Sequence, residues 1–237
     1  MTAWVADLSL ITPLFGLALT LSVYATALSV YANAGMPGPL HPVLVSTVAV
    51  GGILMLTGIP YSRYFEQTWL LHEGLGLFVV LLAVPLYRHM ALIRSSSAMI
   101  GLALVIGSVA AVVTAIALPG FFGAELDIVA TLLPKSSTTA IAVSVSERLD
   151  GIASLTAIVV ITTGLFGAAF GPGLLAAAGI QDHRAVGLAL GVASHAIGTA
   201  RAFQISETAG TFASVGMILN GLLTILLAPA ALALFTS

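Results

Sequence analysis

The sequence predicts an all-α polytopic membrane protein, and three observations support this class. Apolar residues make up 59% of the 237 residues and charged residues only 7%, whereas a soluble globular chain carries about 25% charged residues. The mean hydropathy is +1.14. Stretches near the roughly 20 apolar residues that span a bilayer recur between glycine and proline breaks. We therefore expect one membrane-embedded domain over residues 1–237, in a multi-pass protein of the cell membrane.

Charge, cysteine content and motifs exclude several function classes. Nine acids and seven bases are scattered singly and give a net charge of −2, so no basic run suggests nucleic acid. The chain has no cysteine and therefore neither a disulfide nor a thiolate metal site. Sequence motifs of metalloproteases, serine hydrolases and P-loop ATPases are absent. We expect no enzymatic activity, no cofactor and no metal.

Breakers divide the chain into eight hydrophobic segments. The first lacks a basic flank and carries Asp7 instead, so it is interpreted as a retained span and not a signal peptide. Six segments are predicted to span, and the fifth and seventh are predicted to be discontinuous or re-entrant. The fourth should close at Pro119 and the sixth at Gly171, while residues 59–69 should lie at the headgroup level. In order, the segments cover about residues 8–32, 42–58, 70–87, 98–118, 125–145, 152–170, 185–202 and 208–235.

Orientation follows from the arginines if every segment crosses the membrane once. The side of the membrane that carries more arginines is then the cytoplasmic side, and both termini lie on the opposite, outer side. A re-entrant segment would change this count. The arginines of one side would be Arg88, Arg94, Arg148 and Arg201, and those of the other Arg63 and Arg184.

The most polar stretch of the chain, residues 131–147, lies within the fifth segment. Pro134 lacks a backbone donor and disfavours helix before it, so a break is expected within about two residues. The hydroxyl run after Lys135 should cap a half-helix over about residues 137–145. Its free amides and the lysine would form an anion site. Alternatively, Lys135 snorkels to the interface while the hydroxyls bond their own helix. The run consists of Ser136, Ser137, Thr138 and Thr139.

The seventh segment carries small and polar residues at a helical spacing. Gly187, Gly191, His195 and Thr199 recur every four residues and should share one helix face. Ser194 and Gly198 would lie on its flank. Such a face lets another helix pack closely, which is the ordinary interpretation. His195 can change charge near neutral pH, so a substrate or proton role is the alternative. Arg201 would complement the dipole at the C-terminal end of this helix or take part in the site.

Three motifs in order resemble the LrgB/CidB family. They are residues 84–87 (VPLY), 133–139 (LPKSSTT) and 191–201 (GVASHAIGTAR), and the resemblance covers about residues 40–235. The family usually has LPKSVTTPIA in place of the second motif. The resemblance implies a multi-pass protein described as holin/antiholin-like in bacterial lysis control. It also implies a small LrgA/CidA-like membrane partner. Plastid members look like glycolate/glycerate translocators, and bacterial members have been linked to pyruvate.

This chain departs from the family pattern at three places. Ser137 replaces the usual valine, and Ala140 replaces a proline, so the half-helix can begin earlier. Residues 76–83 are GLFVVLLA where the family tends to have GPATVALA. A helix break and a hydroxyl are lost there, so no substrate contact is carried over from the family's third segment.

Two functions from different classes are compatible with these residues. The first is a secondary carrier for a small monocarboxylate such as glycolate, glycerate, lactate or pyruvate, with or without proton coupling. The two broken segments would then meet near the midplane around the substrate. The second is a holin-like pore or lysis regulator, in which the chain forms homo-oligomers. The predicted substrate-binding residues of the carrier are Lys135, Ser136, Ser137, Thr138, Thr139, Ser194, His195, Gly198, Thr199 and Arg201.

Overall fold

The computed structural model describes residues 14–35, 40–81 and 83–236, and all regular elements in these ranges are helices. Five of the described helices are long and apolar enough to cross a membrane. The predicted class, an all-α polytopic membrane protein, is therefore confirmed. The chain divides into two compact units, Met1–Ala83 and Val84–Ser237, and each is described by itself. The single domain over residues 1–237 stays a prediction.

The first unit contains four described helices, of which α2 contacts α3 and α4. The amide of Gly16 donates to Oε1 of Gln67 over 3.0 Å, and the hydroxyls of Thr20 and Tyr64 are 2.8 Å apart. Residues 76–83 are the stretch that departs from the family pattern. Residue 82 and several side chains of this stretch lie outside the described part of the structure. The helices are α2 (Phe15–Asn33), α3 (Pro42–Thr57), α4 (Tyr61–Gln67) and α5 (Trp69–Leu81).

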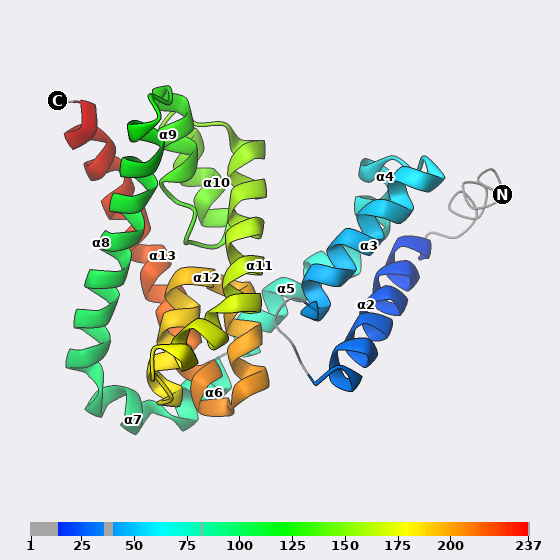
Figure 1. Ribbon diagram of the computed structural model, residues 1–237, viewed down its shortest axis with the longest axis horizontal. Helices are drawn as coiled ribbons and strands as arrows, with labels where there is room; N and C mark the ends of the chain where they lie inside the picture. Colours follow the sequence, from blue (N-terminus) through cyan, green and yellow to red (C-terminus); the bar gives the residue numbers. More distant parts are fainter. Residues whose placement is uncertain (1–13, 36–39, 82, 237) are drawn as a thin grey trace. The chain divides into compact units, whose positions relative to one another are not determined.

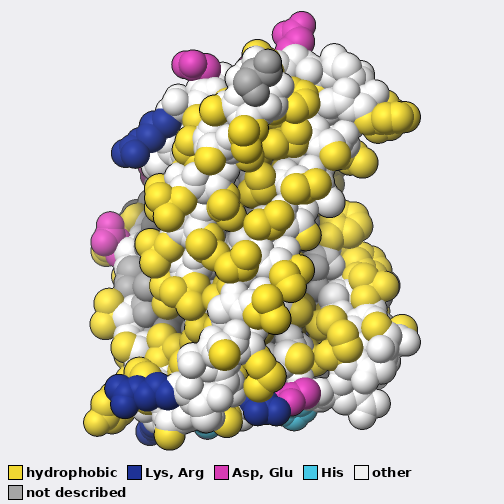
Figure 2. Space-filling model, turned by 90° about the vertical axis from the view of Figure 1, so that its left-hand side faces the viewer, with side chains coloured by type: hydrophobic (Ala, Val, Ile, Leu, Met, Phe, Trp, Pro, Cys, Tyr) yellow, Lys and Arg dark blue, Asp and Glu magenta, His cyan; other side chains and the backbone are white. Residues whose placement is uncertain are grey.

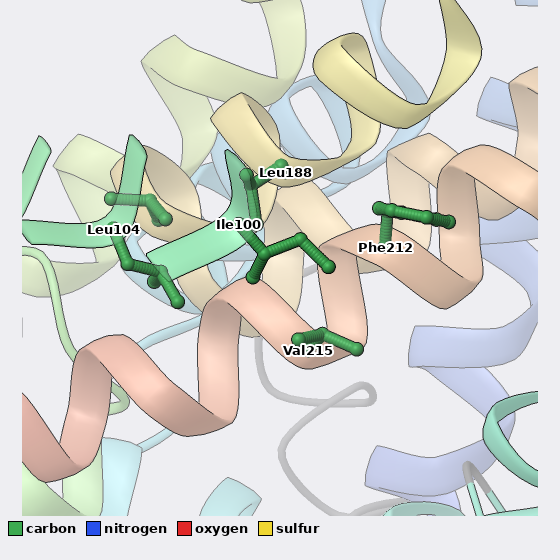
Figure 3. Packing of buried hydrophobic residues seen from close by; sticks show 6 residues of the cluster. Ile100, Leu104, Leu188, Phe212 and Val215 are labelled. Atoms are coloured by element: carbon green, nitrogen blue, oxygen red, sulfur yellow. The ribbon is translucent and has the colours of Figure 1, made fainter. Parts of the chain in front are cut away.

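The second unit is built around three long helices, α8, α11 and α13 (Figure 1). Between them lie shorter elements that enter from both ends of the unit. A buried cluster joins α8 through Ile100 and Leu104 to Leu188 of α12 and to Phe212 and Val215 of α13 (Figure 3). The helices are α6 (Ala83–Arg88), α7 (Met90–Ser95), α8 (Ser97–Phe121), α9 (Leu126–Leu132), α10 (Thr139–Arg148), α11 (Ala153–Ala177), α12 (His183–Ile205) and α13 (Glu207–Thr236).

Two predicted helix ends are wrong. Helix α8 continues through Pro119 to Phe121, and α11 continues through Pro172 to Ala177. Proline removes one backbone hydrogen bond, whereas ending a helix leaves four carbonyls without intrahelical partners. In an apolar environment the smaller loss is tolerated. Proline and glycine were therefore weaker stops here than in a soluble protein.

Helices α9 and α10 form a first re-entrant hairpin, which confirms that the fifth segment is discontinuous. The chain leaves α9 at Leu132 and starts α10 at Thr139. Near the other end of α10, Ser146 accepts a hydrogen bond of 2.7 Å from Thr156, and the hydroxyl of Thr131 accepts one of 2.8 Å from the amide of Ile152. These contacts place the C-terminal end of α10 beside α9. The segment thus enters and leaves at one end of the unit.

Helix α12 forms a second re-entrant hairpin, because its backbone is not helical at His195 (φ 42°, ψ −130°). Ala202 packs with Val186 and Leu190, and a Cβ on Gly198 would meet the carbonyl of Leu190. Residues 196–205 therefore fold back on residues 183–194. The prediction of a discontinuous seventh segment is confirmed.

The predicted shared face of the seventh segment is wrong, since the kink at His195 separates its members. Gly187 and Gly191 do serve close packing. A Cβ on either would collide with the carbonyl of Ala209 or Ala213 in α13. The two glycines precede the kink and both pack against α13, while Thr199 belongs to the returning helix.

The hairpins enter from opposite ends, and charge differs between these ends. Figure 1 shows α9 and α10 at one end of the second unit and α6, α7 and α12 at the other. Figure 2 shows hydrophobic side chains over the middle of the face that α8 exposes, with basic side chains (dark blue) nearer its ends. At the α12 end lie Arg88, Arg94, Arg184 and Arg201 together with Asp182 and Glu207, and at the α9 end lie Glu125, Asp127, Glu147, Arg148 and Asp150.

This charge difference revises the orientation deduced from single crossings. Arg148 moves to the side opposite the other four arginines of this unit, because neither the fifth nor the seventh segment crosses. The positive-inside rule then assigns the α12 end to the cytoplasm and the α9 end to the outside.

We expect cysteine labelling to report this topology, and the cysteine-free chain provides a clean background. Glu125→Cys and Glu147→Cys should both react with an impermeant maleimide on intact cells. Gln181→Cys and Gln204→Cys should react only after permeabilisation. All four positions are exposed. If positions 125 and 147 label from opposite sides, the fifth segment crosses and the hairpin is refuted.

Candidate functional site

A cavity of about 830 Å³ lies in the second unit between α8, α11 and α12. Its lining includes Asp182 and Arg184 at the arginine-rich end and reaches Lys135 and Ser136 in the tip of the first hairpin. Along α8 the lining extends from residue 96 to residue 114, about 27 Å at 1.5 Å per residue. The volume falls in the range of about 300–1,000 Å³ that is typical of ligand sites. The cavity thus leads from one end of the unit to the hairpin tips.

Lys135 lies in the break between α9 and α10, as the sequence predicted. Its backbone amide donates to the carbonyl of Leu132 over 3.1 Å, and its side chain is partly buried. Among the described residues, its ammonium has neither an ion-pair partner nor a hydrogen-bond acceptor. A cation in a mostly apolar cavity is costly without a counter-charge, so this position favours a bound anion.

Ser194 is the last residue before the kink of the second hairpin. Its side chain is fully buried, and within the described part of the chain its Oγ has no hydrogen-bond partner. The hydroxyl is pressed against Gly167 of α11, where a Cβ would overlap it. An unsatisfied buried hydroxyl costs about 1–3 kcal/mol. Ser194 belongs to the lining of the same cavity as Lys135.

The half-helix after Lys135 begins without the predicted side-chain cap. Thr138 is the N-cap residue (φ −67°, ψ 150°), but no side chain accepts a hydrogen bond from the first turn of α10. The helix also runs over Thr139–Arg148, two or three residues later at both ends than predicted. The break itself lies where Pro134 predicted it. Ser136 and Ser137 are buried in the hairpin tip, and the hydroxyl of Ser137 donates to the carbonyl of Thr138 over 3.5 Å.

Asn220 of α13 joins the two hairpin tips, and the sequence interpretation missed it. Its Nδ2 donates to the carbonyl of Ser136 over 2.9 Å and to that of Val192 over 3.2 Å. Its Oδ1 accepts a hydrogen bond of 2.7 Å from Ser108 of α8. The side chain is 1% exposed. A lone asparagine inside an apolar span was the available signal, because such residues usually bond across helices.

His195 faces α11 and is absent from the described lining of the cavity. Its Nε2 lies 3.0 Å from the carbonyl of Val160, which requires the ring to donate there. Gly164 leaves room for the ring. The positive φ of His195 is a strained conformation that costs about 1–3 kcal/mol. The contact with Val160 holds the ring in the orientation that this turn requires.

The structure therefore brings three of the predicted site residues to the cavity, Lys135, Ser136 and Ser194. The others support the hairpins from outside its lining. The hydroxyl of Thr199 donates to the carbonyl of His195 over 2.8 Å, and Arg201 donates to Gln204 over 3.0 Å. The residues outside the lining are Ser137, Thr138, Thr139, His195, Gly198, Thr199 and Arg201.

Comparison with known proteins shows that residues 20–234 match the pattern of the LrgB-like family. The chain belongs to the LrgB-like family. It is 36% identical over 197 residues to the "Holin-like protein CidB" of Staphylococcus epidermidis, covering 83% of this chain and 86% of that protein. It is 34% identical to the protein of the same name in Staphylococcus aureus, covering 84% and 87%. No solved structure matches.

A further relative carries no functional name. The "Uncharacterized protein YwbG" of Bacillus subtilis is 34% identical over 212 residues, which cover 89% of this chain and 93% of that protein. With its apolar helices, the LrgB-like chain is a multi-pass protein of the cell membrane. Both staphylococcal relatives are named holin-like proteins.

At the mouth of the cavity, the LrgB-like protein has an ion pair whose two side chains both stay charged near neutral pH. Nη2 of Arg184 lies 2.6 Å from the carboxylate of Asp182. The side-chain hydrogen bonds from Arg184 lower the pKa of Asp182 from 3.8 to about 2. The stabilisation from this pair is thus present above the ordinary pKa and lost as pH falls through about 2. It provides no switch near neutral pH.

Replacing His195 with glutamine should leave the shape of the pH profile of transport unchanged between pH 5 and 8. The histidine ring faces a carbonyl of α11, and glutamine keeps a donor there while removing titration. Initial uptake rates in proteoliposomes over this range check the prediction. A wild-type pH dependence that disappears in His195→Gln would instead establish the proton role.

Proposed function

We propose that this LrgB-like protein is a secondary carrier for small monocarboxylates of the glycolate, glycerate, lactate and pyruvate class. The observation that carries the proposal is Lys135, whose ammonium has no partner among the described residues and lines a cavity with the unpartnered hydroxyl of Ser194. A carboxylate offers two oxygens that accept hydrogen bonds from both groups. The substrate carboxylate binds Lys135, and Ser136 and Ser194 bond its oxygens.

The two hairpins supply a second, electrostatic contribution. Helix α10 and the returning half of α12 each have their N-terminus toward a hairpin tip. The amide ends of both carry a partial positive charge of about half a unit. Carriers with broken helices commonly direct such ends at an anionic substrate group near the membrane midplane. Ser137, Thr138 and Thr139 begin one of these helices, while His195, Gly198 and Thr199 shape the other.

A second candidate is a holin-like pore or lysis regulator. The printed name of the staphylococcal relatives favours it, since both are called holin-like. A pore has no need of an unpartnered cation beside a buried serine, and the tips that Asn220 ties together stand between the two ends of the unit. The LrgA/CidA-like partner implied by the family and the homo-oligomer that a pore requires belong to this second candidate and stay predictions.

Counterflow in proteoliposomes separates the two candidates. The purified full chain is reconstituted in vesicles loaded with unlabelled lactate, and labelled lactate is added outside. We expect saturable accumulation that glycolate, glycerate and pyruvate compete away. Release of an unrelated uncharged solute such as sucrose at a similar rate, without saturation, would support the pore and reject the carrier.

A further inference from the structure

The cavity around Lys135 is much larger than a two- or three-carbon acid. Its volume of about 830 Å³ corresponds to sites that hold drug-sized ligands. A small acid held at the hairpin tip would leave most of the space along α8 to water or to the rest of a longer molecule. The chemistry of the walls decides which molecules gain from that space.

Polar groups are concentrated at the two ends of the cavity. At the tip, the free groups of the described residues are the ammonium of Lys135 and the hydroxyls of Ser136, Thr163 and Ser194. The hydroxyl of Thr114 already donates to the carbonyls of its own helix at 2.8 and 3.0 Å. One carboxylate and one neighbouring oxygen use this set of donors. Further polar atoms on a ligand would meet no partner there.

The stretch between the tip and the mouth is apolar. No hydroxyl, amide or charged side chain of the described lining interrupts it on the faces of α8 and α12 that enclose it. A ligand that extends from Lys135 toward Arg184 must therefore lie against hydrocarbon. The side chains that form this wall are Ile100, Ala103, Ile106, Leu188, Val192 and Phe212.

We propose that the site selects monocarboxylates with an apolar tail over polyhydroxylated acids, with the carboxylate on Lys135 and the tail along Ile100, Leu188 and Val192. This inference rests on the proposed carrier function and names its substrate class. Each methylene that leaves water for the wall improves binding. Each hydroxyl that reaches the wall loses its water without gaining a partner.

A homologous series of 2-hydroxy acids tests the selection. Lactate, 2-hydroxybutyrate, 2-hydroxypentanoate and 2-hydroxyhexanoate compete with labelled lactate in counterflow, with protein-free vesicles as the blank for passive permeation. We expect the half-inhibitory concentration to fall about three- to fourfold per added methylene until the cavity is filled. Glycerate has nearly the shape of 2-hydroxybutyrate but carries a hydroxyl in place of the methyl group. It should compete at least about tenfold more weakly.

A variant pair locates the effect in the cavity. Ala103→Phe fills the wall and should reverse the gain with tail length, so that 2-hydroxyhexanoate competes more weakly than lactate. Leu102→Phe is the matched control, because Leu102 is 65% exposed and outside the lining. The inference is overturned if glycerate competes as well as 2-hydroxybutyrate, or if affinity is independent of tail length in the wild-type protein. Absence of any saturable lactate exchange would instead reject the carrier itself.

Discussion

Lys135→Met should abolish high-affinity anion transport while leaving the protein folded. The chain has this single lysine, and its ammonium has no partner among the described residues in a largely apolar cavity. Methionine has a similar length and removes a charge whose burial costs roughly 2.5–3.5 kcal/mol near a bilayer centre. A charge-assisted hydrogen bond contributes about 1.5–3 kcal/mol, so the KM for lactate should rise about ten- to hundredfold or uptake should vanish.

Two further variants make the Lys135 result specific. Lys135→Arg should restore only part of the affinity, because a planar guanidinium places its donors differently from a compact ammonium. Arg184→Gln removes a cation from the mouth of the same cavity, where Asp182 already pairs it. Its effect on KM should be less than about threefold, because solvent screens an exposed ion pair and leaves it little influence on binding.

Folding and transport have to be measured on the same preparations. Yield and monodispersity on size-exclusion chromatography report folding, and counterflow reports transport. A Lys135→Met protein that aggregates, or that carries lactate with the wild-type KM, would show that the lysine is structural. The proposed position of the site would then be wrong.

Asn220→Leu should lower both stability and transport by large amounts. Leucine is close to asparagine in size but cannot hydrogen-bond, so the carbonyls of Ser136 and Val192 and the hydroxyl of Ser108 all lose their partner. Each unsatisfied buried group costs about 1–3 kcal/mol. The two hairpin tips would also lose the connection that keeps Lys135 and Ser194 on one cavity.

The size of the Asn220 effect can be compared with a single lost bond. Ser108→Ala removes only the hydrogen bond to Oδ1 and leaves both contacts to the tips in place. Its loss should be about a third of that in Asn220→Leu. Asn220→Asp keeps the acceptor for Ser108 but puts a carboxylate against two carbonyls, so it should resemble the leucine variant.

Thermal stability of these variants needs a probe in the second unit. Both tryptophans, Trp4 and Trp69, lie in the first 83 residues, so their fluorescence would report the wrong unit. Heating followed by size-exclusion chromatography of a fluorescent fusion is suitable. We expect the midpoint of Asn220→Leu to fall by about 5 °C or more. A midpoint and KM equal to wild type would show that the tips hold together without Asn220.

Local sequence signals predicted the class of the protein and the position of the first break, and they indicated that the seventh segment is broken without placing its break at His195. Apolar runs long enough to span a bilayer are unmistakable, because a membrane imposes length and composition on each helix independently of its neighbours. Pro134 and the polar residues around it mark the first break, whereas the small and polar residues from Gly191 to Arg201 indicated only that the seventh segment is unusual. These signals act within one turn of chain and require no knowledge of packing. Helix ends at Pro119 and Gly171 were wrong because the apolar environment outweighs those local stops.

Residue types and their order were enough to establish an all-α membrane protein of the LrgB-like family with a lysine in a broken segment. The packing of the helices was needed to show that both broken segments fold back, which reverses the side assigned to Arg148. Packing also turns His195 toward Val160 and brings Ser194 and Lys135 to one cavity. Asn220, a residue 84 positions away, fixes the tip at Ser136. Contacts at such separation depend on how helices pack against one another, and no local pattern of residue types encodes them.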